Sequence, residues 1–471
     1  MMRHSTPSGI VHLLLAASLL AGCAQMAPRY ERPAAPVPAE FPNAGPLAGG
    51  PAIADQPWQD YFTDPVLRTL IQLALRNNRD LRIAVLNIEA ARAQYQLRRA
   101  DQWPTVNAGV TSSRQTGGNG SNSSNDNVTG LYTAGLSVSA YELDLFGRVR
   151  SLSDAAAAEL LATEEARKAV QISLVASVAT QYLALVADDE LLDLTLRTLR
   201  TREESLKLTQ LRFDNGVSSE LDLRQAQTLV EAARVTLAQL RRQRELDRNA
   251  LVLLVGQALP EWPVRPGRID VMPLVDVPAG LPSDVLLRRP DVVQAEQQLI
   301  AANANIGAAR AAFWPRISLT GSVGTASTQL SDLFKNGAWS FATQLLQPIF
   351  DAGRNRANLA VAQVQRDIAV AQYERAIQAA FRDVADALAG RATLDEQLRA
   401  TRAQAQAEQV RYSLSDLRFR NGVSSSLELL DAERSLFAAQ QAVVQTRLAL
   451  LQNRVSTYRA LGGGNLGTAG E

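Results

Sequence analysis

The chain has 471 residues, a formal net charge of +1 at pH 7 and a single cysteine. A charge this close to zero gives no electrostatic reason to expect a nucleic-acid partner. One cysteine excludes an intramolecular disulfide and a multi-cysteine metal site.

The first 22 residues predict a signal peptide. They open with Arg3 and contain an apolar run over residues 10–20, about half the length of a membrane-spanning helix. The sequence Leu-Ala-Gly-Cys that ends at Cys23 resembles the lipobox of bacterial lipoproteins, in which the cysteine is lipidated, as by palmitate, and becomes the mature N-terminus. The alternative is an ordinary signal peptide followed by an incidental cysteine. Ala24, where an aspartate would resemble the inner-membrane retention signal, favours the outer membrane.

Loss of this segment removes most catalytic chemistry from the chain. Both histidines, His4 and His12, lie within it, and Cys23 is expected to be lipidated. Histidine-dependent triads, histidine-ligated metals and thiol catalysis are therefore excluded. Scattered Asp and Glu on helical faces are better explained as solvated charges. We expect no enzyme, no metal site and no cofactor.

Residues 23–60, rich in Pro, Ala and Gly, predict an extended tether behind the lipid anchor. A helix is expected over 65–99, ended by Trp103-Pro104. Two strand–loop–strand patterns then follow, at 105–141 and 316–346, with one apolar and one small, polar face. The apolar positions are Val106, Ala108, Val110, Tyr132, Ala134, Leu136, Val138, Ala140, Ile317, Leu319, Val323, Trp339, Phe341 and Leu345.

This alternation matches transmembrane β-barrel strands, which are apolar toward lipid and polar toward a lumen. Four strands cannot close a barrel, and lipid does not tolerate open strand edges, so the chain must oligomerise. A dimer gives about eight strands and a trimer about twelve, and the pattern alone does not choose between them. The alternative is a pair of hairpins packed on soluble helices.

Long helices account for most of the remaining chain. Residues 147–213 and 353–419 each run about 67 residues without proline, hence about 100 Å. Two further helices are expected over 219–255 and 425–461. Each runs back from a tip and is roughly 55 Å long. Residues from Leu427 to Tyr458 show a coiled-coil spacing, which fits a hollow bundle or a solid rod. Residues 259–281 predict a connector and residues 462–471 a flexible tail.

The sequence contains an internal repeat. Residues 211–223 return as residues 417–429, and both copies contain Asn-Gly-Val-Ser-Ser. Asn-Gly favours a turn or helix stop, and the serines favour a new helix start. Each copy predicts the tip of a helical hairpin. The repeats occupy 61–258 and 282–461.

These features resemble the TolC-like outer membrane efflux proteins of Gram-negative bacteria, within them the lipoprotein (OprM/NodT-like) branch. The resemblance covers nearly the whole mature chain. Its most specific parts are the lipobox, the two tips, residues 141–148 at a strand-to-helix junction and residues 286–291 at the start of the second repeat.

The resemblance implies an α+β membrane protein, in which a homotrimeric 12-stranded β-barrel continues into a coiled-coil periplasmic tunnel. The implied function is the passive exit duct of a tripartite efflux pump for small molecules such as drugs. The implied partners are a periplasmic adaptor, an inner-membrane transporter and outer-membrane lipid. The motif places adaptor docking at Asn215, Gly216, Val217, Ser218, Asn421, Gly422, Val423 and Ser424.

Relatives close the periplasmic end with acidic rings and inter-helix salt bridges, which points to Asp416 and Arg420, four residues apart. Threefold symmetry would turn Asp416 into a carboxylate ring that favours cations. The repeat places Gln210 and Asp214 at the equivalent positions. The alternative is an ordinary solvated pair on a helix surface.

Two other functions stay open at this point. A type I protein-secretion duct would share the architecture. A non-porous, lipid-anchored coiled-coil scaffold would explain the helices but not the four strands.

Overall fold

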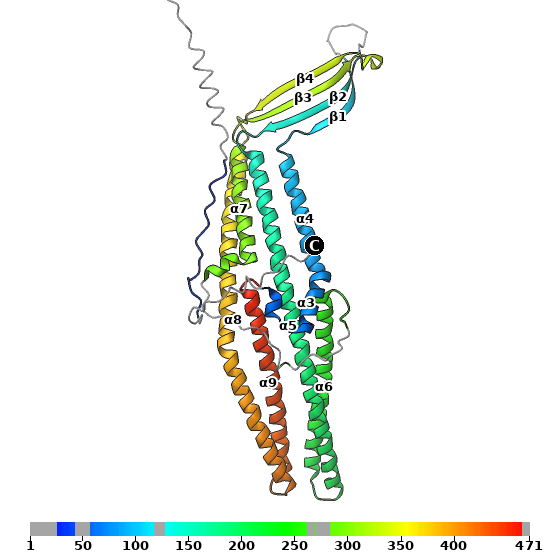
Figure 1. Ribbon diagram of the computed structural model, residues 1–471, viewed down its shortest axis with the longest axis vertical. Coiled ribbons are helices and arrows are strands. Elements are labelled where there is room, and N and C mark those ends of the chain that lie inside the picture. The colour runs from blue at the N-terminus through cyan, green and yellow to red at the C-terminus, as the bar shows by residue number, and fades with distance from the viewer. Residues whose placement is uncertain (1–25, 43–56, 117–127, 261–268, 270–282, 464–471) are drawn as a thin grey trace, which may run out of the picture. The chain divides into compact units, whose positions relative to one another are not determined.

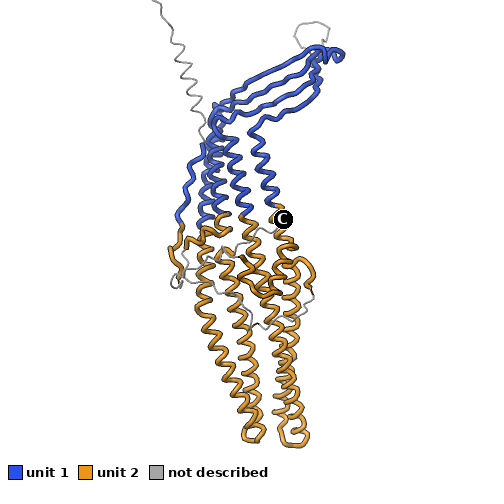
Figure 2. The backbone as a smooth tube through the Cα atoms, viewed as in Figure 1, with its two compact units in different colours: residues 1–34, 87–164, 294–374 blue, residues 35–86, 165–293, 375–471 orange. Residues whose placement is uncertain are grey.

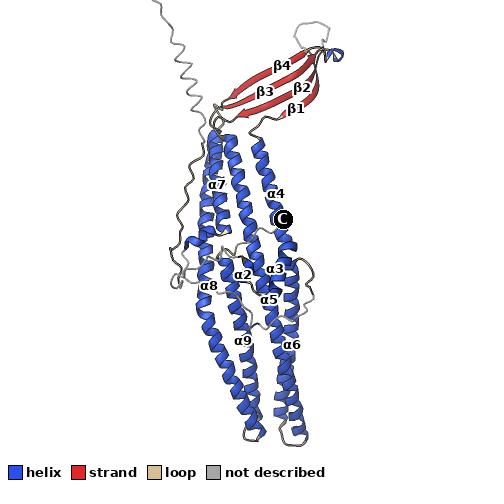
Figure 3. Cartoon of the chain, in the orientation of Figure 1, coloured by secondary structure: helices blue, strands red, loops and turns tan. Residues whose placement is uncertain are grey.

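A computed structural model describes residues 26–42, 57–116, 128–260, 269 and 283–463. The expected signal peptide, the lipidation site Cys23 and most of the connector and the tail lie outside these residues. The described elements, in chain order, are α2 (Trp58–Tyr61), α3 (Pro65–Asn77), α4 (Arg79–Ala100), β1 (Val106–Thr116), β2 (Val128–Leu143), α5 (Arg148–Asp214), α6 (Glu220–Val255), η3 (Ser283–Arg288), α7 (Pro290–Ala311), β3 (Arg316–Ser327), η4 (Leu330–Asp332), β4 (Gly337–Leu346), α8 (Arg354–Arg420) and α9 (Ser426–Ala460). Figures 1 and 3 show long helices and one sheet.

The chain divides into two compact units, coloured in Figure 2. Unit 1 comprises residues 1–34, 87–164 and 294–374, and it contains all four strands. Unit 2 comprises residues 35–86, 165–293 and 375–471, and it contains both hairpin tips. Each unit draws on both sequence repeats, so neither repeat forms a separate domain.

The four strands of unit 1 form one antiparallel sheet in the order β1-β2-β3-β4. The sequence predicts two hairpins, and the pairing of β2 with β3 joins them into this sheet. One cross-strand row is apolar and consists of Ala108, Leu136, Val323 and Trp339. The adjacent row, on the opposite face, is polar and consists of Asn107, Ser137, Ser322 and Ser340. The sheet therefore has the two-faced character that the alternation predicts.

Strand β2 is bent near its end. Its register with β3 shifts between Val138 and Tyr141, and Ala140 adopts the left-handed conformation with φ 51°. The Ala140 amide leaves the ladder and donates to the Thr320 hydroxyl at 3.1 Å. This bulge increases the local twist just before the chain enters α5.

The N-terminal segment of unit 1 packs on α7. Glu296 accepts hydrogen bonds from the Tyr30 hydroxyl at 2.9 Å and from Arg32 Nε and Nη2 at 2.7 and 2.8 Å. Asn303 donates to the Pro28 carbonyl at 2.7 Å. Residues 26–32, which we call the strap, are thus fixed to a helix rather than free as a linker would be.

In unit 2 the core lies between long helices. The predicted coiled-coil positions of α9 are buried at Leu430, Phe437, Val444, Leu451, Val455 and Tyr458, whereas Leu427 near the tip is 59% exposed. Helix α5 includes an 18-residue stretch apolar enough to cross a membrane, but 61% of that stretch is buried within the protein. We therefore assign this stretch to the core of the protein.

The single helix expected over 65–99 is wrong, because the structure has a break at Asn78 between α3 and α4. The backbone of Asn78 is extended, with φ −62° and ψ 132°. Its buried side chain accepts from the Leu81 amide at 2.9 Å and donates to the Leu254 carbonyl at 2.9 Å. Asn78 thus caps a new helix and attaches it to α6.

Candidate functional site

Both tips of unit 2 end their incoming helix in the same way. Gly216 and Gly422 take φ values of 74° and 71°, and the following valine amides donate to Arg212 and Arg418 carbonyls at 2.8 and 2.9 Å. This is the Schellman arrangement, which needs a residue without a Cβ at the left-handed position. The preceding Asn215 and Asn421 instead donate their side-chain amides to Leu211 and Leu417 carbonyls at 2.7 and 2.6 Å.

Each tip presents an exposed valine. Val217 is 72% exposed and Val423 is 68% exposed. A reversal of the chain needs only the glycine beside each of them, so the turn geometry gives no reason for a large apolar side chain in water. Exposed apolar residues at equivalent places on two tips are typical of a contact surface.

The two tips start their outgoing helices differently. At the first tip, Ser219 and Asp222 form a capping box, with the Asp222 amide donating to Ser219 Oγ at 3.2 Å. At the second tip, Ser425 makes no side-chain cap, and the Ser424 hydroxyl is buried without a hydrogen-bond partner among the described residues. The predicted serine cap is thus present in the first repeat only.

Asp222 also connects the tips. Its carboxylate accepts hydrogen bonds from Ser219 Oγ at 2.6 Å, from Ser218 Oγ at 3.3 Å and from Ser426 Oγ on the second tip. These bonds, that from Ser219 first, hold the pKa of Asp222 below its usual range. Asp222 was not predicted, although Ser-x-x-Asp before a helical run is a capping signal that the sequence contains.

The candidate gate residues form local pairs. Arg420 Nε donates to Asp416 Oδ1 at 3.0 Å, with side chains 73% and 28% exposed. At the equivalent place in the first repeat, the Gln210 amide donates to Asp214 Oδ1 at 2.8 Å. Each pair lies on one helix, so within a single chain it stabilises that helix and leaves Asp416 accessible to water.

A further charged group near the second tip was not predicted. Arg411 of α8 pairs with Asp431 of α9, which also accepts from Arg434 at 2.6 Å. The pKa of Asp431 is lowered, chiefly by the hydrogen bond from Arg411. The partners Arg411 and Asp431 lie 20 residues apart on opposite sides of the turn, and helical spacing within one helix does not reveal them.

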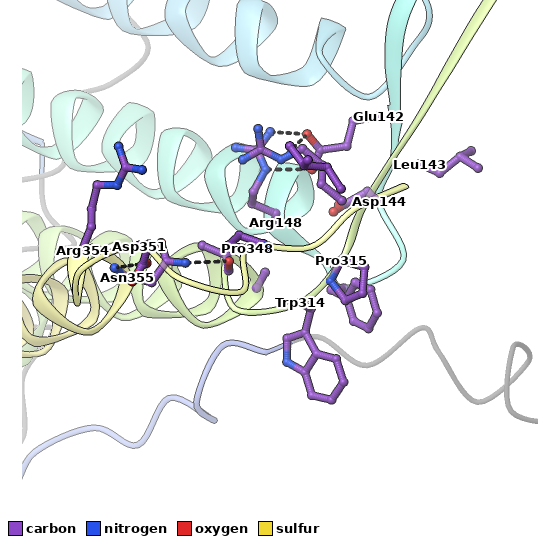
Figure 4. A pocket seen from close by; sticks show the side chains of 15 residues that line it. Glu142, Leu143, Asp144, Arg148, Trp314, Pro315, Pro348, Asp351, Arg354 and Asn355 are labelled. Atoms are coloured by element: carbon purple, nitrogen blue, oxygen red, sulfur yellow. Dashed lines mark hydrogen bonds and ion pairs between the residues drawn. The ribbon is translucent and has the colours of Figure 1, made fainter. Parts of the chain in front are cut away.

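Unit 1 contains a cavity of about 340 Å³ where strands meet helices. Figure 4 shows an ion pair among its charged side chains, in which Arg148 donates to both Glu142 oxygens at 2.8 and 2.7 Å. Asp351 accepts from the Asn355 amide at 2.9 Å and so starts α8. In the same way Asp144 accepts from the Arg150 amide at 2.7 Å and starts α5. These groups direct the chain from strand into helix.

Among the residues that the structure describes, no group of three or more His, Cys, Asp or Glu side chains is placed to hold a metal ion. The polar groups described above act in turns, caps and ion pairs. The arrangement suits a contact surface at the end of helical hairpins.

Comparison with known proteins identifies the family. The model of the outer membrane efflux protein family matches residues 70–257 and 281–463, one match for each repeat. The chain belongs to the outer membrane efflux protein family. It is 48% identical over 463 residues to the probable efflux pump outer membrane protein TtgC of Pseudomonas putida, covering 97% of this chain and 95% of that one. It is 46% identical over 473 residues to the outer membrane protein OprJ of Pseudomonas aeruginosa, covering 97% and 96%.

The structure also matches a solved outer membrane efflux protein. The open state of the MtrE outer membrane channel of Neisseria gonorrhoeae superposes with a TM-score of 0.86 at 41% identity, covering 94% of this chain and 100% of that one. The expected TolC-like fold is confirmed, with four strands and long helices per chain and two repeats, as in trimeric channels. The protein is an outer-membrane efflux channel and not an enzyme.

Proposed function

We propose that three copies of this chain form the exit duct of a tripartite pump that removes drugs and solvents. The observation that supports this most directly is the sheet of unit 1, in which β1 and β4 are the outer strands. Both outer strands have backbone groups that another strand can pair with. Three copies would join β4 of one chain to β1 of the next and close twelve strands around a lumen.

The faces of the sheet fit this closure. Trp339, Phe341 and Leu345 on β4 are 80%, 65% and 62% exposed, and they share one face. The serines of the polar row lie on the other face, where Ser322 and Ser340 hydrogen-bond at 2.7 Å. The apolar face would contact lipid and the polar face would line the lumen.

The proposed cargo class follows the relatives. One TtgC of Pseudomonas putida is named a toluene efflux pump outer membrane protein, and ArpC of the same species is named an antibiotic efflux pump outer membrane protein. A protein-secretion duct is less well supported, since these relatives are named for the efflux of small molecules. A non-porous scaffold is also less well supported, because it leaves the two-faced sheet without a role.

Adaptor docking is proposed at the tip residues Asn215, Gly216, Val217, Ser218, Asn421, Gly422, Val423 and Ser424. The two exposed valines would pack against apolar side chains of a periplasmic adaptor that links this duct to an inner-membrane transporter. Photo-crosslinkers at Ser218 and Ser424 should capture the adaptor in cells. Absence of a product at both positions, even when the adaptor is overexpressed, would exclude docking there.

We propose in addition that Cys23 is lipidated. The strap supports this, because Met26 lies three residues after Cys23 and its carbonyl accepts from Arg310 at 3.4 Å, one residue from the end of α7. Three residues span at most about 11 Å, so the anchor would start close to the strands that enter the membrane. Palmitate labelling of wild type but not of Cys23→Ser is expected.

The test of the whole proposal is export from cells that lack their own outer-membrane efflux channels. Expression of this chain should lower accumulation of a fluorescent dye such as ethidium. A Val217→Asp/Val423→Asp variant that still forms trimers should not. Equal accumulation with and without the wild-type chain, in the presence of a compatible adaptor and transporter, would contradict the proposal.

A further inference from the structure

The apolar face of the sheet ends in a charged residue. On β1 this face contains Val106, Ala108 and Val110, and the next two positions that share it are Ser112 and Arg114. The chain enters β1 from α4 at the Val106 end. Arg114 therefore lies at the opposite end of the sheet, beyond the last apolar residue of the strand.

Arg114 contacts the neighbouring strand on the same face. Its Nη2 donates to the Tyr132 hydroxyl of β2 at 3.3 Å. Tyr132 shares this face because the register pairs it with Ser112, and Arg114 itself is paired with Gly130. A Cβ added at Gly130 would lie 4.0 Å from Arg114 Cγ and 3.6 Å from Tyr132 Cε2. The glycine thus leaves a gap that the cationic and the phenolic side chains border together.

The charge of Arg114 is not neutralised within the part of the chain that the structure describes, where no carboxylate pairs with it. At the other end of the sheet, by contrast, Arg148 and Arg316 share the Glu142 carboxylate at 2.7 and 3.6 Å. The bond to Tyr132 occupies one of the several N–H donors of the guanidinium. Tyr132 accepts this bond, so its own O–H can donate to a second group. A positive charge with free donors suits an anion.

The length of the strands gives the depth of this site in a membrane. On β3, Ile317 at the helix end of the apolar face and Ser327, which pairs with Tyr132, lie ten residues apart. This is about 34 Å along the strand, or about 26 Å across a membrane at a tilt of about 40°. The apolar band of outer-membrane barrels is about 25 Å tall. Tyr132 therefore marks the edge of the band, and Arg114 lies just beyond it, at the level of lipid head groups.

This depth is compatible with a charged residue on the lipid-facing surface. An arginine there is costly at the midplane of the bilayer and costs little near the interface, and tyrosine is enriched at the interface. The alternative is an arginine that only water solvates. The bond to Tyr132, the gap over Gly130 and the lack of a paired carboxylate favour a bound anion instead.

We infer that Arg114 and Tyr132 bind the phosphate of a phosphorylated lipid in the leaflet farther from the helices. A guanidinium binds phosphate through paired, charge-assisted N–H bonds. Val110 and Leu136, 69% and 49% exposed on the same face, offer an apolar surface for the acyl chains. This surface favours a lipid over free phosphate. The inference rests on the proposed function, which places the apolar face in the membrane and the helices in the periplasm, so that the leaflet is the outer one.

Native mass spectrometry of the purified trimer, freed of bound lipid and titrated with diphosphoryl lipid A, tests the site. Wild type should bind one molecule per chain. Arg114→Gln should raise the dissociation constant about tenfold, as expected for loss of a charged hydrogen-bonding partner. Tyr132→Phe should raise it about threefold. Arg114→Lys should lie between wild type and Arg114→Gln, because lysine keeps the charge but not the planar fork.

A matched variant and two comparison ligands make the result decisive. Lys335→Gln removes a cation at the same end of the sheet that is already paired with Asp332 at 2.7 Å, and it should bind as wild type does. Lipid A without its phosphates and inorganic phosphate alone should both bind more weakly than diphosphoryl lipid A. Equal affinity in wild type and Arg114→Gln, an equal loss in Lys335→Gln, or equal binding of either comparison ligand would overturn the inference.

Conductance of the same trimers separates this inference from the proposed function. Trimers that conduct and that bind the lipid through Arg114 support both. Conducting trimers whose lipid affinity does not depend on Arg114 contradict the lipid site alone. Trimers that bind the lipid through Arg114 but do not conduct contradict the duct and support the site.

Discussion

Asp222 in the first turn of α6 accepts a hydrogen bond from Ser426 at the start of α9, and this bond joins the two hairpin tips of one chain. The same carboxylate caps α6 through Ser219. One residue therefore starts a helix and connects the two tips that carry the exposed valines.

Asp222→Ala should remove both functions. Loss of the cap is expected to cost about 1 kcal/mol, and loss of the inter-tip bond should weaken adaptor capture. Ser426→Ala should weaken capture with less effect on thermal stability. Glu428→Ala is the matched control, because Glu428 occupies the equivalent position in the second tip and pairs with Arg418 at 3.6 Å instead. Capture as strong in Asp222→Ala as in Glu428→Ala would show that the bond does not organise the tips.

The strap gives a second prediction. Glu296 is 6% exposed and receives three hydrogen bonds from Tyr30 and Arg32. Glu296→Ala should release residues 26–32 and speed tryptic cleavage after Arg29 several-fold, because charge-assisted bonds to a buried carboxylate are strong. Glu159→Ala, at an exposed position of α5 in the same unit, is the control. Cleavage at the wild-type rate in Glu296→Ala would mean that other contacts hold the strap.

A pH dependence is expected from Asp188. Burial, together with the neighbouring Asp247 carboxyl of α6 and Asp189 of its own helix, raises its pKa to about 7, and Arg244 opposes the shift. An aspartate whose pKa is raised in the folded state keeps a proton at pH values where the unfolded chain has lost it. Its contribution to stability is complete below about pH 4, falls as pH rises toward 7, and is then constant.

The free energy of unfolding of wild type should therefore fall by at most about 1.4 kcal/mol per pH unit within that window. Asp188→Asn should remove this fall. Thermal midpoints of the purified protein between pH 4 and pH 8 provide the check. The thermal midpoint of the variant should increase relative to that of wild type as pH rises. A constant difference across the range would show that Asp188 titrates normally.

Backbone strain at the start of α8 makes a further prediction. Ala352 adopts φ 53°, and Gly353 after it adopts φ 86°. The left-handed conformation costs an alanine roughly 1–2 kcal/mol. Glycine avoids this cost but loses more conformational freedom on folding, so the substitution regains only part of it. Ala352→Gly should raise the thermal midpoint slightly, and Ala352→Val should lower it clearly. A higher midpoint for valine than for glycine would contradict the assigned conformation.

Much of this fold can be predicted from the sequence, because its signals are local. The period of two from Val106 to Val138 predicts strands, and the long proline-free stretches predict α5 and α8. The Asn-Gly pairs predict the turns, since Gly216 and Gly422 alone in each tip adopt the left-handed conformation that such turns require.

The contacts that connect these elements could not be predicted in the same way. Arg202 and Glu433 lie 231 residues apart, and Arg32 and Glu296 lie 264 apart. Charged residues in helical stretches usually face water, so nothing local distinguishes Arg202 from its neighbours. Asn78 was missed because its partner is the Leu254 carbonyl on another helix, and tertiary contact of this kind overrides helix propensity.

We propose that Asp416 closes the tip end of the duct. Single-channel conductance of the purified, lipidated trimer in a planar bilayer, wild type beside Asp416→Ala, tests it most directly. We predict a small conductance that prefers cations in wild type and a larger, less selective conductance in the variant. Equal conductance in the two forms, or a correctly folded trimer that conducts in neither, would contradict this proposal.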